Sequence, residues 1–131
     1  AEPEAGARTD RVEALWRSLG ANPVRTSAVK HDRLMSLVSQ LPQLTANSLA
    51  AILDSAGVGP DDLGPGGRGM IRLAASNPEV WADLLEGANA DLVAALRTLA
   101  GSLQRIADDL ESGDVEAIVS LMEQTRTWSD G

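Results

Sequence analysis

Apolar side chains recur at intervals of seven along the segment from residue 85 to residue 110. The two interleaved series are Leu85, Leu92, Leu99 and Ile106, and Asn89, Leu96, Leu103 and Leu110. Residues at this spacing form one stripe along a helix, and such a stripe is stable only when another helix covers it. The segment therefore predicts an extended helix that is packed along its length.

The length of this stripe favours pairing between two copies of the chain. A chain of 131 residues forms one domain and has difficulty covering so long an apolar helix alone. We expect a homodimer whose core includes Leu85, Asn89, Leu92, Leu96, Leu99, Leu103 and Ile106. Asn89 is the polar member of this set, and it either fixes the register of the paired helices or lines a pocket near Trp81.

The rest of the sequence indicates an all-α fold of about five or six helices. Phe and Tyr are absent, so the core must be aliphatic, which favours helices. We expect residues 1–10 to be a flexible lead-in and residues 11–131 to form one helical domain. Candidate N-caps are Asp10, Ser27, Asn77 and Asp114. Pro42 should kink the second helix, and the Gly-rich stretch from residue 57 to residue 69 should be a loop.

Composition excludes several classes of function. The net charge of −8 argues against nucleic acid as a partner. With no Cys and one His, disulfides and thiolate zinc sites are excluded and no metal site is expected. No apolar run approaches the length of about 20 residues that a membrane span needs, so we expect no membrane partner. The lack of Cys fits a cytoplasmic protein.

Arg72 and Trp81 are the strongest candidates for a binding site. Arg72 follows the glycine-rich stretch, and its planar guanidinium suits a carboxylate. The alternative is a surface Arg that pairs with Asp61 or Asp62. Trp81 comes nine positions after Arg72 and either walls a pocket or anchors the core.

The single His, His31, precedes Asp32, but adjacent residues of a helix point in different directions. A catalytic dyad is therefore less favoured than an exposed or structural His. Downstream, two glutamine side chains lie on either side of a leucine and a proline in the run Ser39-Gln40-Leu41-Pro42-Gln43. The amide of Gln donates and accepts hydrogen bonds but carries no proton charge near neutral pH.

Two stretches, HDRLMSLVSQLPQL at residues 31–44 and GPGGRGMIRLAASNPEVW at residues 64–81, carry a resemblance. They resemble the C-terminal helical half of prephenate and arogenate dehydrogenases, and the likeness runs from about Val12 to Trp128. It implies a domain like the C-terminal part of 6-phosphogluconate dehydrogenase, which forms an intertwined dimer. It also implies a substrate pocket in which Arg72 holds a carboxylate and Trp81 forms a wall. The remaining members implied for this pocket are His31, Gln40 and Gln43.

The resemblance implies a parent enzyme that oxidatively decarboxylates prephenate or arogenate with NAD(P), a step of tyrosine biosynthesis. No strand is expected before the glycine-rich run GPGGRG at residues 64–69, so we expect the chain to bind no cofactor and to be inactive alone. Its expected role is dimerisation and half of the substrate pocket. The alternative is a stand-alone helical dimerisation module with a degenerate pocket, because Gln40 and Gln43 replace the two His of the family motif.

Overall fold

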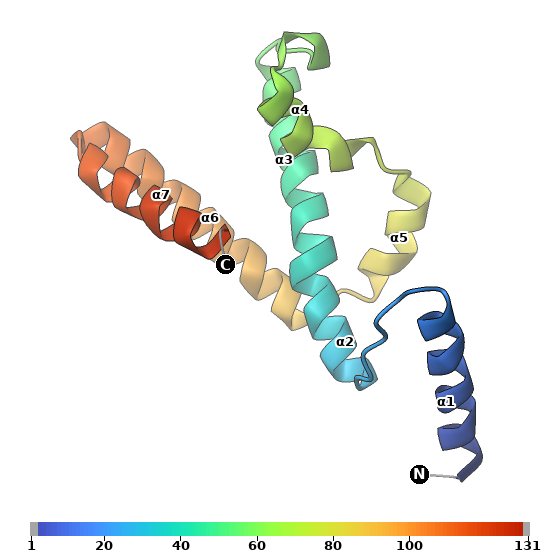
Figure 1. The fold of residues 1–131 in the computed structure, drawn as a ribbon. Coiled ribbons are helices and arrows are strands. Elements are labelled where there is room, and N and C mark those ends of the chain that lie inside the picture. Colours follow the sequence, from blue (N-terminus) through green and yellow to red (C-terminus); the bar gives the residue numbers. More distant parts are fainter. Residues whose placement is uncertain (1–2, 130–131) are drawn as a thin grey trace. The chain divides into compact units, whose positions relative to one another are not determined.

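The computed structural model describes residues 3–129, which form α-helices, 3₁₀ turns and one π-helical turn, with no strand in that range (Figure 1). The predicted all-α fold is therefore confirmed. The chain divides into two compact units, Ala1–His31 and Asp32–Gly131.

In the first unit, helix α1 spans Pro3–Ser18 and is followed by a turn in which Gly20 takes a left-handed φ of 82°. The predicted start at Arg11 was too late, because residues 3–10, expected as a flexible lead-in, belong to this helix. Asp10 is consequently inside α1 and does not cap it. The segment after the turn has no regular structure up to Ser27.

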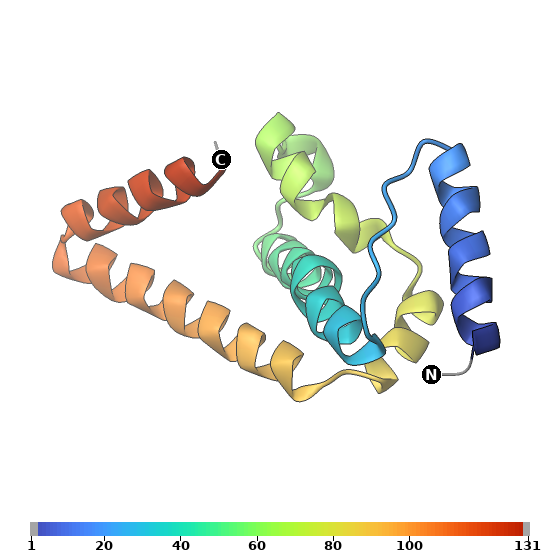
Figure 2. The same cartoon turned by 60° about the horizontal axis from the view of Figure 1, so that its bottom comes forward.

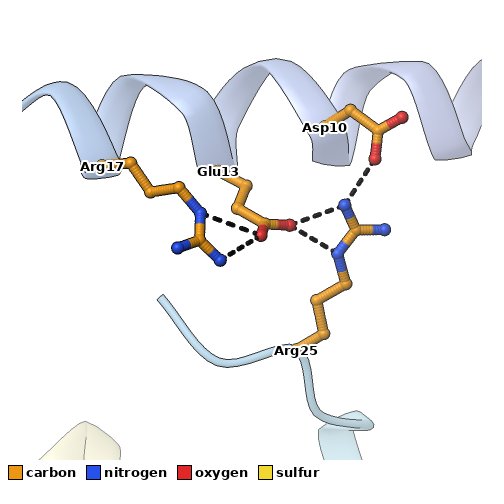
Figure 3. A network of polar contacts seen from close by, with 4 residues as sticks. All are labelled: Asp10, Glu13, Arg17 and Arg25. Atoms are coloured by element: carbon orange, nitrogen blue, oxygen red, sulfur yellow. Dashed lines mark hydrogen bonds and ion pairs between the residues drawn. The ribbon is translucent and has the colours of Figure 1, made fainter. Parts of the chain in front are cut away.

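An exposed ion-pair network joins that segment to α1 (Figure 3). The carboxylate of Glu13 accepts hydrogen bonds from Arg17 Nη2 at 2.8 Å and from Arg25 Nε at 2.6 Å. Arg25 also pairs with Asp10. The hydrogen bonds from Arg17 and Arg25 lower the pKa of Glu13, and those to Asp10 and Glu13 raise the pKa of Arg25. Asp10 and Glu13 thus anchor the residues after α1, and for Asp10 this is a role different from the predicted N-cap.

The next helical run is α2 at Ala28–Met35, a π-helical turn at Ser36–Gln40 and α3 at Leu41–Ser55. Ser27 caps α2 as predicted, since its Oγ accepts from Lys30 N at 3.3 Å. In the wide turn, the N–H of Leu41 donates to Ser36 O, five residues earlier. Pro42 has no N–H to continue the regular ladder, so the interruption expected at this proline takes the form of a π turn directly before it.

The glycine-rich segment is partly helical, contrary to prediction. A 3₁₀ turn at Pro60–Asp62 precedes α4 at Pro65–Ile71, and a second 3₁₀ turn, Arg72–Ala75, follows. Pro65 occupies the first turn of α4, where its missing N–H costs little. Gly67 lets this helix approach Leu63, because a Cβ there would lie 3.3 Å from the Leu63 side chain.

The extended helix predicted across residues 85–110 is divided between two helices, α5 at Pro78–Glu86 and α6 at Ala90–Ser112. Asn77 caps α5 as predicted and accepts from Glu79 N at 3.0 Å. The chain leaves α5 at Gly87, and Asn89 then begins α6. Leu85 therefore lies on a different helix from the other members of the heptad series.

Helix α7 spans Val115–Ser129 and folds back along α6 (Figures 1 and 2). Gly113 permits the reversal through a left-handed φ of 78°, and Asp114 Oδ1 accepts from Ala117 N at 3.1 Å. The predicted cap at Asp114 is confirmed. The start of α6 contacts the π turn and α3, and α4 and the second 3₁₀ turn also pack on α3.

The buried face of the α2–α3 run is small and polar. Ser36, Gln43 and Ala46 are buried, with 0%, 3% and 3% exposure. The neighbouring apolar residues Leu34, Leu37 and Val38 are about half exposed. Within one chain, the first part of this run therefore leaves three apolar side chains partly open to water.

Candidate functional site

The apolar series on α6 is covered at one end of the helix and uncovered at the other. Leu92 is 2% exposed, whereas Leu103 is 58% and Leu110 is 61% exposed. Leu92, Leu99, Leu103, Ile106 and Leu110 lie on one face, because their spacing follows the helical repeat. The helix thus continues an apolar stripe beyond the point where its own chain buries it.

Ser36 and Asn89 fix the covered end of α6. Ser36 Oγ lies 3.0 Å from Asn89 Oδ1 and 3.0 Å from Asp32 O, and it can donate to either. Asn89 Oδ1 also accepts from Leu92 N at 3.1 Å, which caps α6. Asn89 therefore begins α6 instead of lying inside one continuous heptad helix, and it does not line the cavity beside Trp81. Ser36 was missed, and its only signal was a small polar residue among apolar neighbours.

A cavity of about 260 Å³ brings two of the predicted pocket residues together. Gln43 and Asn47 line it from α3, and Trp81 and Leu85 line it from α5. Ser76, in the turn before α5, contributes a hydroxyl to the wall. Asn47 and Ser76 were not predicted, and they became identifiable only when α3 and α5 were placed side by side.

The amide of Gln43 is held by protein groups. Its Nε2 donates to Asn47 Oδ1 at 2.7 Å and to Leu73 O at 2.8 Å, and its Oε1 accepts from Ser76 Oγ at 3.2 Å. Both donor hydrogens are thus used, and one acceptor site of Oε1 remains. In this arrangement Gln43 links α3 to the turn before α5 and shapes the cavity wall.

The other predicted pocket residues lie elsewhere. Arg72 is exposed at the start of its 3₁₀ turn and does not line the cavity of Trp81. Its expected surface alternative, a pair with Asp61 or Asp62, is also not formed. Gln40 lies in the π turn, and its Oε1 is buried without a hydrogen-bond partner among the described residues. His31 is exposed and belongs to the first unit, whereas the cavity belongs to the second.

No cluster of three or more His, Asp or Glu side chains between residues 3 and 129 could hold a metal ion. No helix in that part of the chain is long and apolar enough to cross a membrane.

These features define a class of protein: an all-helical module that carries a partly uncovered apolar helix stripe and, between α3 and α5, a small and mostly apolar cavity. The family described as prephenate dehydrogenase, dimerization domain, matches residues 27–124. This chain belongs to that family. The matched residues include the π turn, the cavity and all of α6, while α1 and its ion-pair network lie outside the match.

Proposed function

We propose that this chain is a homodimerisation domain and that its dimer core is the uncovered half of the α6 stripe. The observation that carries the proposal is that Leu92 is buried whereas Leu103 and Leu110, on the same face of the same helix, are 58% and 61% exposed. Burying apolar surface stabilises by roughly 25 cal/mol per Å², so these leucines favour a state in which another chain covers them. The family's description as a dimerization domain supports the same assignment.

Sedimentation equilibrium of the purified chain tests this function, and twice the mass of one chain is the expected result. Leu103→Asp places a charge on the stripe and should give a monomer, because burying an unpaired charge costs several kcal/mol. Gln104→Glu, which adds a charge at the neighbouring exposed position, is the control and should remain dimeric. A monomer at all protein concentrations for the unmodified sequence would refute the proposal. Leu99→Asp should be more damaging than Leu103→Asp, because Leu99 is less exposed in the single chain.

We further propose that the parent protein is a prephenate or arogenate dehydrogenase and that the cavity beside Trp81 contributes to its substrate pocket. The parent would use NAD(P), but the residues present here do not form a site for it. The glycine-rich segment is helical in α4, and no strand precedes it within residues 3–129. We therefore assign no step of hydride transfer to this chain, which supplies the dimer and part of the substrate wall.

Ligand binding tests the pocket. Trp81 fluorescence is the reporter, with Trp16→Gln and Trp128→Gln removing the two exposed tryptophans. Prephenate or tyrosine should bind at about millimolar concentration, because one side of the pocket is open to water. Arg72 lies outside this cavity in the single chain, and only the family resemblance assigns it to the substrate carboxylate. If it reaches that carboxylate, Arg72→Ala should weaken binding about ten- to a hundredfold, the worth of a charge-assisted pair of about 1.5–3 kcal/mol. Equal fluorescence responses in the unmodified and Arg72→Ala proteins would exclude Arg72 from ligand binding.

A second candidate is a stand-alone dimerisation module without a working pocket. The engagement of both Gln43 donors by Asn47 and Leu73 favours it, because no donor of that amide is left for a ligand. In this case the chain forms the dimer but its Trp81 fluorescence does not respond to prephenate, arogenate or tyrosine. The two measurements together therefore separate the candidates.

A further inference from the structure

The described residues that line the cavity between α3 and α5 are all uncharged. Trp81 and Leu85 belong to its apolar lining, and its polar side chains are Gln43, Asn47 and Ser76. Its volume of about 260 Å³ is below the roughly 300–1,000 Å³ of sites that hold a drug-sized ligand, so it accommodates only part of a small molecule. A ligand group that enters is therefore recognised by neutral hydrogen-bonding groups and by contact with the Trp81 ring.

The backbone carbonyl of Leu73 fixes how the neighbouring amides are oriented. A carbonyl oxygen only accepts hydrogen bonds, so the Gln43 atom at 2.8 Å from Leu73 O is the donor Nε2. The same Nε2 lies 2.7 Å from Asn47, whose facing atom must accept and is therefore Oδ1. Ser76 Oγ donates to the other end of the Gln43 amide, at 3.2 Å from Oε1. The orientation of the Asn47 amide thus follows from the position of a backbone group.

Asn47 consequently directs its NH₂ group away from Gln43. The two residues are four positions apart and lie on one face of α3, but Gln43 is 3% exposed whereas Asn47 is exposed to solvent. No acceptor among residues 3–129 takes a hydrogen bond from Asn47 Nδ2. An amide nitrogen carries two donor hydrogens, so Asn47 has two to offer a molecule that enters the cavity. Gln43, whose own two donor hydrogens are used, orients this group.

We propose that Asn47 binds the ligand in this cavity, by donating from Nδ2 to a carboxylate oxygen of the substrate. The inference rests on the substrate pocket proposed above and adds the residue that makes the polar contact within the cavity. A carboxylate is the favoured group because hydrogen bonds to a charged acceptor are about twice as strong as those between neutral groups. The apolar part of the ligand next to that carboxylate lies against Trp81.

Titration of the ¹⁵N-labelled full chain with prephenate, followed by ¹H–¹⁵N correlation spectra, tests this contact directly. The NH₂ signals of Asn47, assigned by their loss in Asn47→Asp, should shift as prephenate is added, because these hydrogens donate to it. The NH₂ signals of Asn77 are the internal reference, since Asn77 caps α5 and does not line the cavity. Shifts of the Gln43 NH₂ signals with those of Asn47 unchanged would overturn the proposal.

The affinities of matched variants identify the ligand group that Asn47 contacts. Asn47→Ala should lower the affinity for prephenate about tenfold or more, because it removes a hydrogen bond to a charged group. Asn47→Asp keeps an acceptor for Gln43 Nε2 but places a carboxylate beside that of the ligand, so it should cost at least about threefold more than Asn47→Ala. Asn77→Asp is the control, because it adds the same charge close to the cavity, and Asp also caps helices well. It should bind prephenate as the unmodified chain does.

The outcomes separate this inference from the proposed pocket. If both Asn47 variants bind prephenate as tightly as the unmodified chain, Asn47 makes no contact with the ligand and the pocket remains. Equal losses in the two Asn47 variants would assign Asn47 to an uncharged oxygen and overturn the carboxylate. An equal loss in Asn77→Asp and Asn47→Asp would show a general effect of charge and overturn the contact. If neither the Trp81 fluorescence nor the spectra of the unmodified chain respond to prephenate, the pocket and this inference both fall.

Discussion

Ser36 and Asn89 are 53 positions apart in the sequence, yet the hydroxyl of one lies 3.0 Å from the amide oxygen of the other. Through this contact the π turn meets the N-terminus of α6. Asn89 Oδ1 also accepts from the N–H of Leu92, the most buried large apolar residue described. One side chain thus caps a helix and joins it to the segment that precedes α3.

Asn89→Ala should destabilise the fold by about 2–3 kcal/mol, because it leaves the N–H of a buried Leu92 without a partner. The control is Asn77→Ala, which removes the cap of α5 but leaves the N–H of an exposed Glu79 to water. Its expected cost is about 1 kcal/mol. Urea denaturation followed by circular dichroism measures both. Equal losses would show that the burial of Leu92 adds nothing to the cap.

Two glycines on the α6–α7 hairpin should respond in opposite directions to alanine. Gly113→Ala should destabilise by about 1–2 kcal/mol, because its φ of 78° is left-handed and strains any other residue. Gly101→Ala should stabilise by up to about 1 kcal/mol, because the added Cβ meets nothing closer than the Arg105 guanidinium at 3.8 Å. Denaturation midpoints that move in the same direction would contradict the assigned turn.

Lowering the pH should break the ion pairs that Glu13 makes with Arg17 and Arg25. Its pKa is lowered by hydrogen bonds from Arg17 and Arg25, so the ion pairs are complete above the ordinary Glu pKa and are lost as pH falls through the lowered value. Arg25→Ala should move the pKa of Glu13 back up, as measured by the pH dependence of its carboxyl ¹³C shift. Arg8→Ala is the control, since it removes a cation of α1 that makes none of these contacts with Glu13. A pKa unchanged by Arg25→Ala would mean that the pair does not persist in solution.

Salt should strengthen the dimer. Each chain carries a net charge of −8, so association brings two negative chains together, and the proposed contact is apolar. Raising the ionic strength from about 0.1 M to about 1 M shortens the screening length from about 10 Å to about 3 Å. The dissociation constant from sedimentation should therefore fall. A rise would show that ion pairs across the interface outweigh the repulsion.

Local chemistry was predicted well from the sequence. Ser27, Asn77 and Asp114 act where expected, because a cap depends on a few neighbouring residues. Asn89 was misplaced because the heptad spacing continues through it, although Gly87 and Ala88 interrupt the helix. The spacing alone does not reveal such a break.

Which face of the α2–α3 run is buried could not be predicted from the sequence of one chain. Its leucines have the spacing of a core-facing stripe, but the residues that this chain buries are Ser36, Gln43 and Ala46. An apolar pattern indicates that a helix face is covered by other side chains. It does not indicate whether those side chains belong to the same chain or to another one. In the candidate site, Gln43 and Trp81 line one cavity because α3 and α5 pack together. Arg72 is exposed and lies outside that cavity in the single chain.

The exposure of Leu103 and Leu110 on α6 has a consequence for how the stability of the folded chain depends on protein concentration. If the leucines from Leu103 to Leu110 acquire their cover only from a second copy, separating the copies removes part of the hydrophobic core of each. Diluting the protein then lowers the stability of the folded chain, and the melting temperature rises with protein concentration. In a cell, the rate at which the chain is synthesised would help to set the fraction of it that is folded.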